Sequence, residues 1–205
     1  MINKLFINIV TEDALSAAVF RRLILESGQL YEIRSEYGQA GKTYIDRKLK
    51  DFNNASKALP FFVLRDLDTD ECAPLLVKKF FPFPQYPNLL FRIAVREVEA
   101  WLLADIKGFS SYLGISAKKI PSQVETIMNP KEYLINLARK SRKRDIKNDI
   151  VPYKNSTAKQ GRNYNNRLID FVNNFWDMKK ATENSDSLLR AFLAIQKFIP
   201  LERTT

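Results

Sequence analysis

The 205-residue chain has no histidine and one cysteine, and its 33 lysines and arginines exceed its 23 aspartates and glutamates by a net charge of +10. These counts exclude Ser-His-Asp triads, histidine-ligated zinc and an intramolecular disulfide, and a lone cysteine fits a reducing, cytoplasmic setting. No apolar run approaches the roughly 18 residues of a membrane span, whereas the positive charge favours an anionic partner such as nucleic acid, DNA before RNA.

The first part of the chain alternates strand patterns with helix patterns. Residues 4–10 form a largely apolar run that predicts a strand, residues 30–37 predict a second strand, and each is followed by a helix pattern. Glu12 comes directly after the first run, either as a site residue or only as a favourable charge at a helix start. Its position predicts a place at the carboxyl end of the first strand.

A glycine-lysine turn, Gly38 to Lys42, follows the second strand. It is not a Walker A loop, because Glu36 stands where that loop requires glycine. Two glycines and a lysine between a strand and a helix can still present amides and a cation to a phosphate. A flexible turn with an exposed lysine is the other interpretation.

The third strand pattern, residues 61–64, stops at three carboxylates spaced by two. These are Asp66, Asp68 and Asp70, and an EF-hand is excluded because its sixth position would be Glu71 instead of glycine. Crowded carboxylates repel one another unless a cation lies between them, and their hard oxygens suit Mg²⁺ or Mn²⁺. A solvated acidic turn that caps a helix is the simpler alternative.

A fourth strand pattern, residues 88–95, leads into Glu97 and Glu99 at the start of another helix. Strands that alternate with helices predict right-handed crossovers and a parallel sheet of about four strands flanked by helices, over residues 1–105. Parallel strands end at one edge of the sheet, where ligands bind. We therefore expect one site there, built from these residues: Glu12, Lys42, Asp66, Asp68, Asp70, Glu97 and Glu99.

Residues 106–205 predict a basic helical region packed on the first domain. Asn129 followed by proline predicts a capped helix that continues through a basic run to Lys147, and residues 151–163 predict a polar loop. A basic helix end is either solvated or in contact with phosphate. The nucleic-acid-binding candidates are Arg139, Lys140, Arg142, Lys143, Arg144, Lys159, Arg162 and Arg167.

An acidic residue after the first strand and D-x-D after a later one resemble the Toprim domain, and four segments resemble a Toprim-like bacterial family of unknown function. These are Gly38–Lys42, Val63–Asp68, the R-E-V-E-A-W-L-L-A-D block within Arg92–Asp105, and Gly161–Tyr164. The family is distantly similar to nucleases of the overcoming-lysogenization-defect class. One departure is Asp13, where Toprim domains usually have glycine. The resemblance implies an anti-phage defence role beside an ABC-type or SMC-like ATPase.

Together these features lead to two hypotheses. The first is a metal-dependent nuclease subunit in which Glu12, Asp66 and Asp68 bind Mg²⁺ or Mn²⁺, Glu97 and Glu99 complete a second metal shell or orient water, and Lys42 offsets phosphate charge. The second is a non-catalytic nucleic-acid-binding or regulatory subunit of an ATPase complex.

Overall fold

One parallel β-sheet forms the centre of the molecule in a computed structural model that describes residues 4–201. Its four strands lie in the order β2-β1-β3-β4, and every neighbouring pair is parallel. This confirms the predicted α/β class with a parallel sheet. The strands are β1 (Leu5–Thr11), β2 (Tyr31–Gly38), β3 (Phe61–Asp66) and β4 (Leu89–Ala94).

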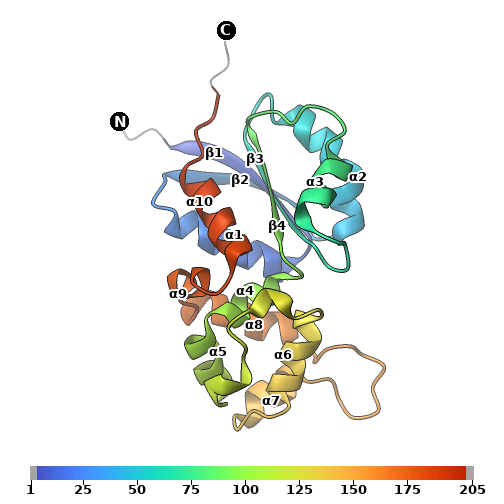
Figure 1. Ribbon diagram of the computed structural model, residues 1–205, viewed down its shortest axis with the longest axis vertical. Coiled ribbons are helices and arrows are strands. Elements are labelled where there is room, and N and C mark those ends of the chain that lie inside the picture. Colours follow the sequence, from blue (N-terminus) through green and yellow to red (C-terminus); the bar gives the residue numbers. More distant parts are fainter. Residues whose placement is uncertain (1–3, 202–205) are drawn as a thin grey trace.

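Helices cover both faces of this sheet (Figure 1). Helix α1 (Ala14–Glu26) packs on one face, and α2 (Lys42–Ala55) and α3 (Ala73–Phe80) pack on the other. The chain moves in one direction from β1 to β2 and in the opposite direction from β2 to β3 and β4. Crossovers of one hand therefore place α1 opposite the two later helices.

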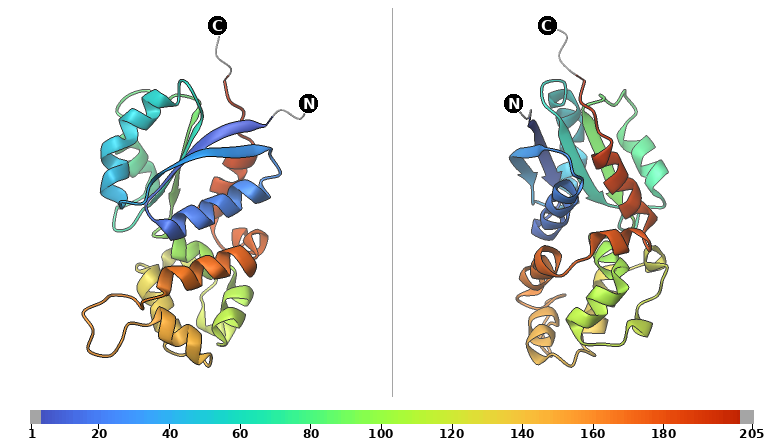
Figure 2. Two further views of the ribbon diagram at one scale, coloured as in Figure 1. Left: turned by 180° about the vertical axis from the view of Figure 1, so that it is seen from behind. Right: turned by 90° about the vertical axis from the view of Figure 1, so that its left-hand side faces the viewer.

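The remaining helices form a layer beyond the carboxyl edge of the sheet, except for the last one (Figures 1 and 2). Helix α10 returns and packs against β4 on the same face as α1. One apolar cluster runs from Ile9 in β1 through Trp101 and Phe171 to Ile195, so the core is continuous across the predicted division at residue 105. The helices are α4 (Val98–Ala104), α5 (Ile106–Leu113), α6 (Pro130–Ala138), α7 (Arg144–Ile150), α8 (Tyr164–Asn174), α9 (Met178–Thr182) and α10 (Asp186–Gln196).

The continuous basic helix expected up to Lys147 is wrong. Helix α6 ends at Ala138 and α7 begins at Arg144, with a turn between them. The hydroxyl of Ser141 accepts a hydrogen bond from the Lys143 backbone N–H at 3.0 Å and lies 2.5 Å from the carbonyl of Leu113, to which it donates. Such local side-chain bonds offer the backbone an alternative to the helix, which explains the break.

The described part of the chain, residues 4–201, contains no helix that combines the length and the apolar character needed to cross a membrane.

Candidate functional site

The site candidates from β1 and β3 meet where the strand order reverses. The Asp66 backbone N–H donates to Glu12 Oε1 at 2.9 Å, and Asp66 Oδ1 accepts from the Val98 backbone N–H at 3.1 Å. These two bonds join the end of β1, the end of β3 and the first turn of α4. In open α/β sheets such a reversal opens a crevice beyond the strand ends, which is the usual place for a ligand.

The carboxylates of this edge repel one another and are desolvated. Burial raises the pKa of Glu12 to about 7, and the neighbouring charge of Asp68 adds to the shift. The pKa of Asp66 lies well above its usual range, because its carboxyl is desolvated and faces the charges of Glu12, Glu99 and Asp68. Perturbed pKa values of this kind concentrate at functional sites, although structural clusters also produce them.

The glycine-lysine turn passes over the end of β1 and carries Lys42 to the site. Gly38 has φ +98, and a Cβ there would lie 2.0 Å from the carbonyl oxygen of Thr11, so only glycine fits. The Gly41 N–H donates to the Glu12 carbonyl at 3.0 Å, which fixes the start of α2. Lys42 Nζ then lies 2.8 Å from Asp68 Oδ2, where it forms a half-exposed ion pair.

Asp70 lies apart from this group. Its carboxylate pairs with Arg65 at 3.1 Å, and the same buried guanidinium binds both oxygens of Asp46 at 2.9 and 3.1 Å. Arg65 is only 3% exposed and therefore needs these acidic partners. The contacts give a structural role to Asp70 and no support to its predicted metal role.

The two glutamates of α4 contact the helical layer. Glu99 is 5% exposed and accepts a hydrogen bond from the Tyr164 hydroxyl at 2.9 Å; its pKa rises to about 7 because of burial and the charge of Glu97. Glu97 Oε2 accepts from the Lys131 backbone N–H at 2.8 Å, and burial raises its pKa. Glu97 thus caps α6, and the capping bond expected from Asn129 is not made.

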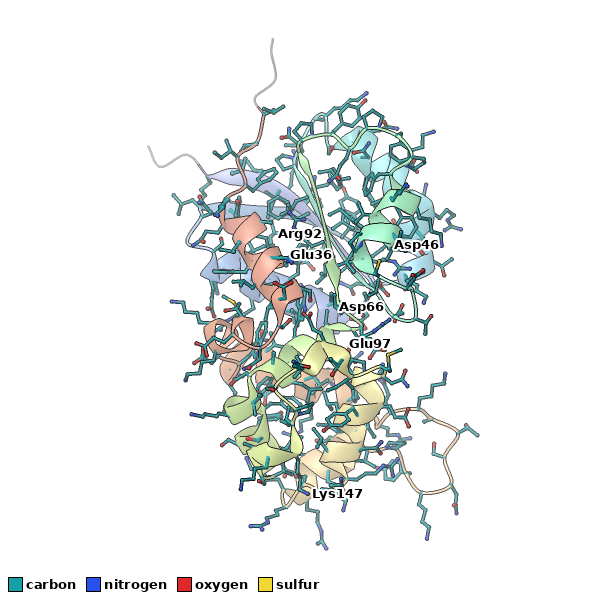
Figure 3. All side chains as sticks on the ribbon, in the orientation of Figure 1. Glu36, Asp46, Asp66, Arg92, Glu97 and Lys147 are labelled. Atoms are coloured by element: carbon teal, nitrogen blue, oxygen red, sulfur yellow. The ribbon has the colours of Figure 1, made fainter. Side chains whose placement is uncertain are left out.

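Figure 3 labels Asp66, at the end of β3, and Glu97, just before α4, in the region where the sheet meets the helical layer. In residues 4–201, no three acidic or cysteine side chains converge closely enough in this conformation to form a ready-made metal site. The donor chemistry nevertheless fits Mg²⁺ or Mn²⁺, because all the candidate ligands are carboxylate oxygens. A cation would also relieve the repulsion that helps to raise the pKa of Glu12 and Asp66.

A polar groove of about 1280 Å³ begins beside Glu97 and runs between α6 and the loop of residues 151–160. Its four cations outnumber its two carboxylates, Glu97 and Glu132. The loop projects from the helical layer in Figure 1, and its base is closed by the Gly161 N–H, which donates to the Ile150 carbonyl at 2.9 Å. The cations are Lys131, Arg139, Lys154 and Lys159.

Only part of the predicted basic set lines this groove. Arg139 and Lys159 do. Lys143 donates to the Ser111 carbonyl at 3.0 Å, and Arg167 pairs with Asp145 at 3.2 Å and with Asp149 at 2.5 Å. The others are exposed and do not line the groove: Lys140, Arg142, Arg144 and Arg162.

Sequence reasoning missed two residues that organise the site. Tyr164 holds Glu99, and the Lys131 ammonium lies 5.0 Å from the centre of the Tyr164 ring. The G-x-x-Y segment marked Tyr164 as part of a motif, but nothing in its spacing indicated a partner 65 residues earlier. Lys131 carried no signal beyond its place in a helix start.

Comparisons with protein-family models, curated proteins and solved structures found no match to this chain.

Proposed function

We propose that the protein is a metal-dependent nuclease subunit that hydrolyses phosphodiester bonds of nucleic acid, with DNA favoured over RNA. The observation that carries the proposal is the position of Glu97. This carboxylate belongs electrostatically to the cluster around Asp68 and also lines the cation-rich groove. A phosphate backbone held in the groove would therefore reach the carboxylates.

Glu12, Asp66 and Asp68 would hold the metal ion, Mg²⁺ or Mn²⁺. Bound there, the ion would polarise the scissile phosphate and lower the pKa of an attacking water. Asp68 is paired with Lys42 in the present conformation, so a ligand role for Asp68 would require this ion pair to loosen, which would leave the lysine able to contact the phosphate. The ammonium then offsets charge that develops on the phosphate oxygens.

Glu97 would orient the attacking water or accept its proton. Its pKa is raised from the ordinary value by burial, and a carboxylate with a pKa nearer neutrality is a better base at neutral pH. Glu99 is too deeply buried to meet substrate directly in this conformation. Its bond to Tyr164 instead fixes the first turn of α4 and with it the orientation of Glu97.

A second candidate function is a nucleic-acid-binding subunit of an ABC-type or SMC-like ATPase complex without catalysis of its own. The Lys42–Asp68 ion pair favours it, because the lysine already neutralises one of the expected ligands. The groove would serve this function equally well, since its cations belong to α6 and the 151–160 loop.

The test is cleavage of circular single-stranded DNA, circular duplex DNA and RNA in MnCl₂. Wild type and Asp51→Asn should cut at equal rates, whereas Asp66→Asn should lose at least 100-fold, an effect of about 2.7 kcal/mol on the barrier. Asp51 is a matched control because it is an exposed acid whose one ion pair within residues 4–201 is with Lys48 at 2.9 Å. No cleavage by wild type, with groove binding intact, would overturn the nuclease proposal in favour of the second candidate.

A further inference from the structure

A second cavity, of about 610 Å³, lies along the free edge of β4, and residues next to the turn after β3, Leu67 and Glu71, also line it. Strand β4 is the last strand of the sheet, so its outer edge has no neighbouring strand. The cavity wall is largely apolar, with Val77, Phe91 and Ile93 among its residues. Three arginines also line it: Arg92, Arg96 and Arg190.

Two of these arginines have partners. Arg96 Nη1 donates to the backbone carbonyls of Asp68 and Asp70, each at 3.0 Å. Arg190 forms an exposed ion pair with Asp186 at 2.9 Å. Neither guanidinium needs a further ligand to explain its position.

Arg92 is different. Its Nε is buried and has no hydrogen-bond partner among the described residues, and its Nη1 makes one bond, to the adjacent Phe91 carbonyl at 3.2 Å. No acidic side chain of residues 4–201 forms an ion pair with it. Burial lowers its pKa, with no neighbouring acid to raise it again. Figure 3 places Arg92 between β4 and α10.

The acidic side chains that line the cavity do not provide a negative partner for Arg92. Glu125 accepts hydrogen bonds from the Ser185 hydroxyl at 2.6 Å and the Ser187 N–H at 2.8 Å, and Asp186 is paired with Arg190. Glu71 is exposed at the rim. Ser187 Oγ accepts from Val95 N–H and Trp101 Nε1–H, which leaves its hydroxyl hydrogen free to donate to a ligand.

Arg65, on the adjacent strand β3, is an example of an arginine whose charge is balanced by acidic partners. It is buried between Asp46 and Asp70 and donates to both. A buried guanidinium is costly unless it is paired and hydrogen-bonded, and its planar fork of donors matches carboxylate and phosphate oxygens. Arg92 is only partly buried, but its Nε is enclosed without a hydrogen-bond partner and no carboxylate of residues 4–201 pairs with it.

We propose that the β4-edge cavity binds a small organic oxyanion, whose carboxylate or phosphate group pairs with Arg92 on the α10 side of the strand while its apolar body crosses the free edge of β4 to Val77, Phe91 and Ile93 on the α3 side. This site is separate from the proposed catalytic edge, and its occupancy does not depend on nuclease activity. The ligand is small because the cavity volume of about 610 Å³ is within the range of ordinary small-molecule pockets.

The first experiment is calorimetric titration of the whole chain with benzoate, adenosine 5′-monophosphate and inorganic phosphate at constant ionic strength. Benzoate and the nucleotide present a carboxylate or a phosphate on an aromatic body, so their comparison identifies the preferred group. Inorganic phosphate has the charge without the body and should bind at least tenfold more weakly than the better of the two. Absence of binding by both organic anions would overturn the proposal.

Variants separate Arg92 from the rest of the cavity. Arg92→Gln should weaken the better ligand at least tenfold, whereas Arg190→Gln, at the exposed rim, should change its affinity less than threefold. Asp66→Asn should leave it unchanged. Equal binding by wild type and Arg92→Gln would contradict the proposal.

Thermal unfolding in chloride buffer gives a test that needs no ligand. Arg92→Met should melt at the same temperature as wild type or higher, because it removes a partly buried charge that has no carboxylate partner among residues 4–201. Arg65→Met leaves Asp46 and Asp70 without their cationic partner and should therefore melt at a lower temperature than wild type. A large destabilisation by Arg92→Met would show that Arg92 already has an adequate partner and would overturn the proposal.

Discussion

The Asp66 backbone N–H donates to the Glu12 carboxylate at 2.9 Å, across the ends of two neighbouring parallel strands. This bond fixes one carboxylate beside another at the point where the sheet reverses its direction. It also leaves the Asp66 carboxyl itself, with its raised pKa, directed to the start of α4. Backbone N–H groups thus hold Glu12 and Asp66 in place, whereas Asp68 is paired with Lys42.

Asp66→Asn should fold and should be at least as stable as wild type when metal is absent. The amide oxygen of asparagine can still accept from the Val98 N–H, while the substitution removes a charge that faces Glu12 and Glu99. Thermal unfolding in EDTA checks this. A fall of several degrees in the melting temperature would mean that the Asp66 charge stabilises the metal-free fold.

The metal-free protein should lose stability as the pH rises from about 4.5 to about 7. Glu12 and Glu99 have pKa values of about 7 in the folded protein against 4.5 ordinarily, so the folded state binds more protons in this window. The free energy of unfolding therefore falls with pH there, and the raised pKa values of Asp66 and Glu97 act in the same direction. Urea unfolding at several pH values measures it.

Glu12→Gln is the control for this pH dependence. It removes one of the carboxyl groups whose pKa is raised and should flatten the fall between pH 4.5 and pH 7, with little change below that window. An identical slope in wild type and Glu12→Gln would show that Glu12 titrates normally.

Tyr164→Phe should destabilise the protein by about 1–3 kcal/mol, because a buried carboxyl loses its hydrogen-bond donor. It should also raise the pKa of Glu99 further, since the hydroxyl favours the charged form. Urea unfolding gives the first effect, and the pH dependence of stability gives the second. Tyr112→Phe is the matched control, because its hydroxyl bonds the Arg167 carbonyl at 2.8 Å and has no contact with Glu99.

Lys154→Gln combined with Lys159→Gln should weaken binding of single-stranded DNA and reduce its salt dependence. For a single strand, the slope of log K against log salt becomes shallower by about 0.7 for each phosphate that no longer has a cationic partner. Fluorescence anisotropy with Asp66→Asn as the background measures binding without cleavage. Arg144→Gln combined with Lys147→Gln, two exposed cations outside the groove, should have a slope close to that of the parent.

The existence and order of the strands were predictable from their apolar or β-rich patterns, although β3 continues through Arg65 and Asp66, two residues beyond its apolar run. The resulting edge gathers Glu12, Asp66 and Asp68, as a parallel sheet requires. The position of the Asp70 side chain was not predictable from the two-residue spacing of Asp66, Asp68 and Asp70. Side chains alternate only while the strand continues, whereas β3 ends at Asp66 and Asp68 has φ +52. The left-handed residue breaks the alternation and carries Asp70 to Arg65.

Pairings between distant segments were the other part that the sequence left open. Asn129 has the composition of a helix cap, yet Glu97, on another element, supplies the bond to α6. The groove depends on a loop without periodicity, closed at its base by Gly161. Neither the Glu97 bond to α6 nor the position of the loop can be predicted from neighbouring residues in the sequence, because both depend on how the helical layer packs against the sheet.

Calorimetric titration with MnCl₂ tests the central claim most directly, on wild type, Asp66→Asn and the exposed-site control Asp51→Asn. The account predicts one specific site in wild type and Asp51→Asn, with affinity that weakens as the pH falls below 7 and Glu12 becomes protonated. Asp66→Asn should lose that site while remaining folded. Equal binding by all three proteins, or no binding by wild type at about pH 7.5 with single-stranded DNA present, would contradict a metal-binding edge at Glu12 and Asp66.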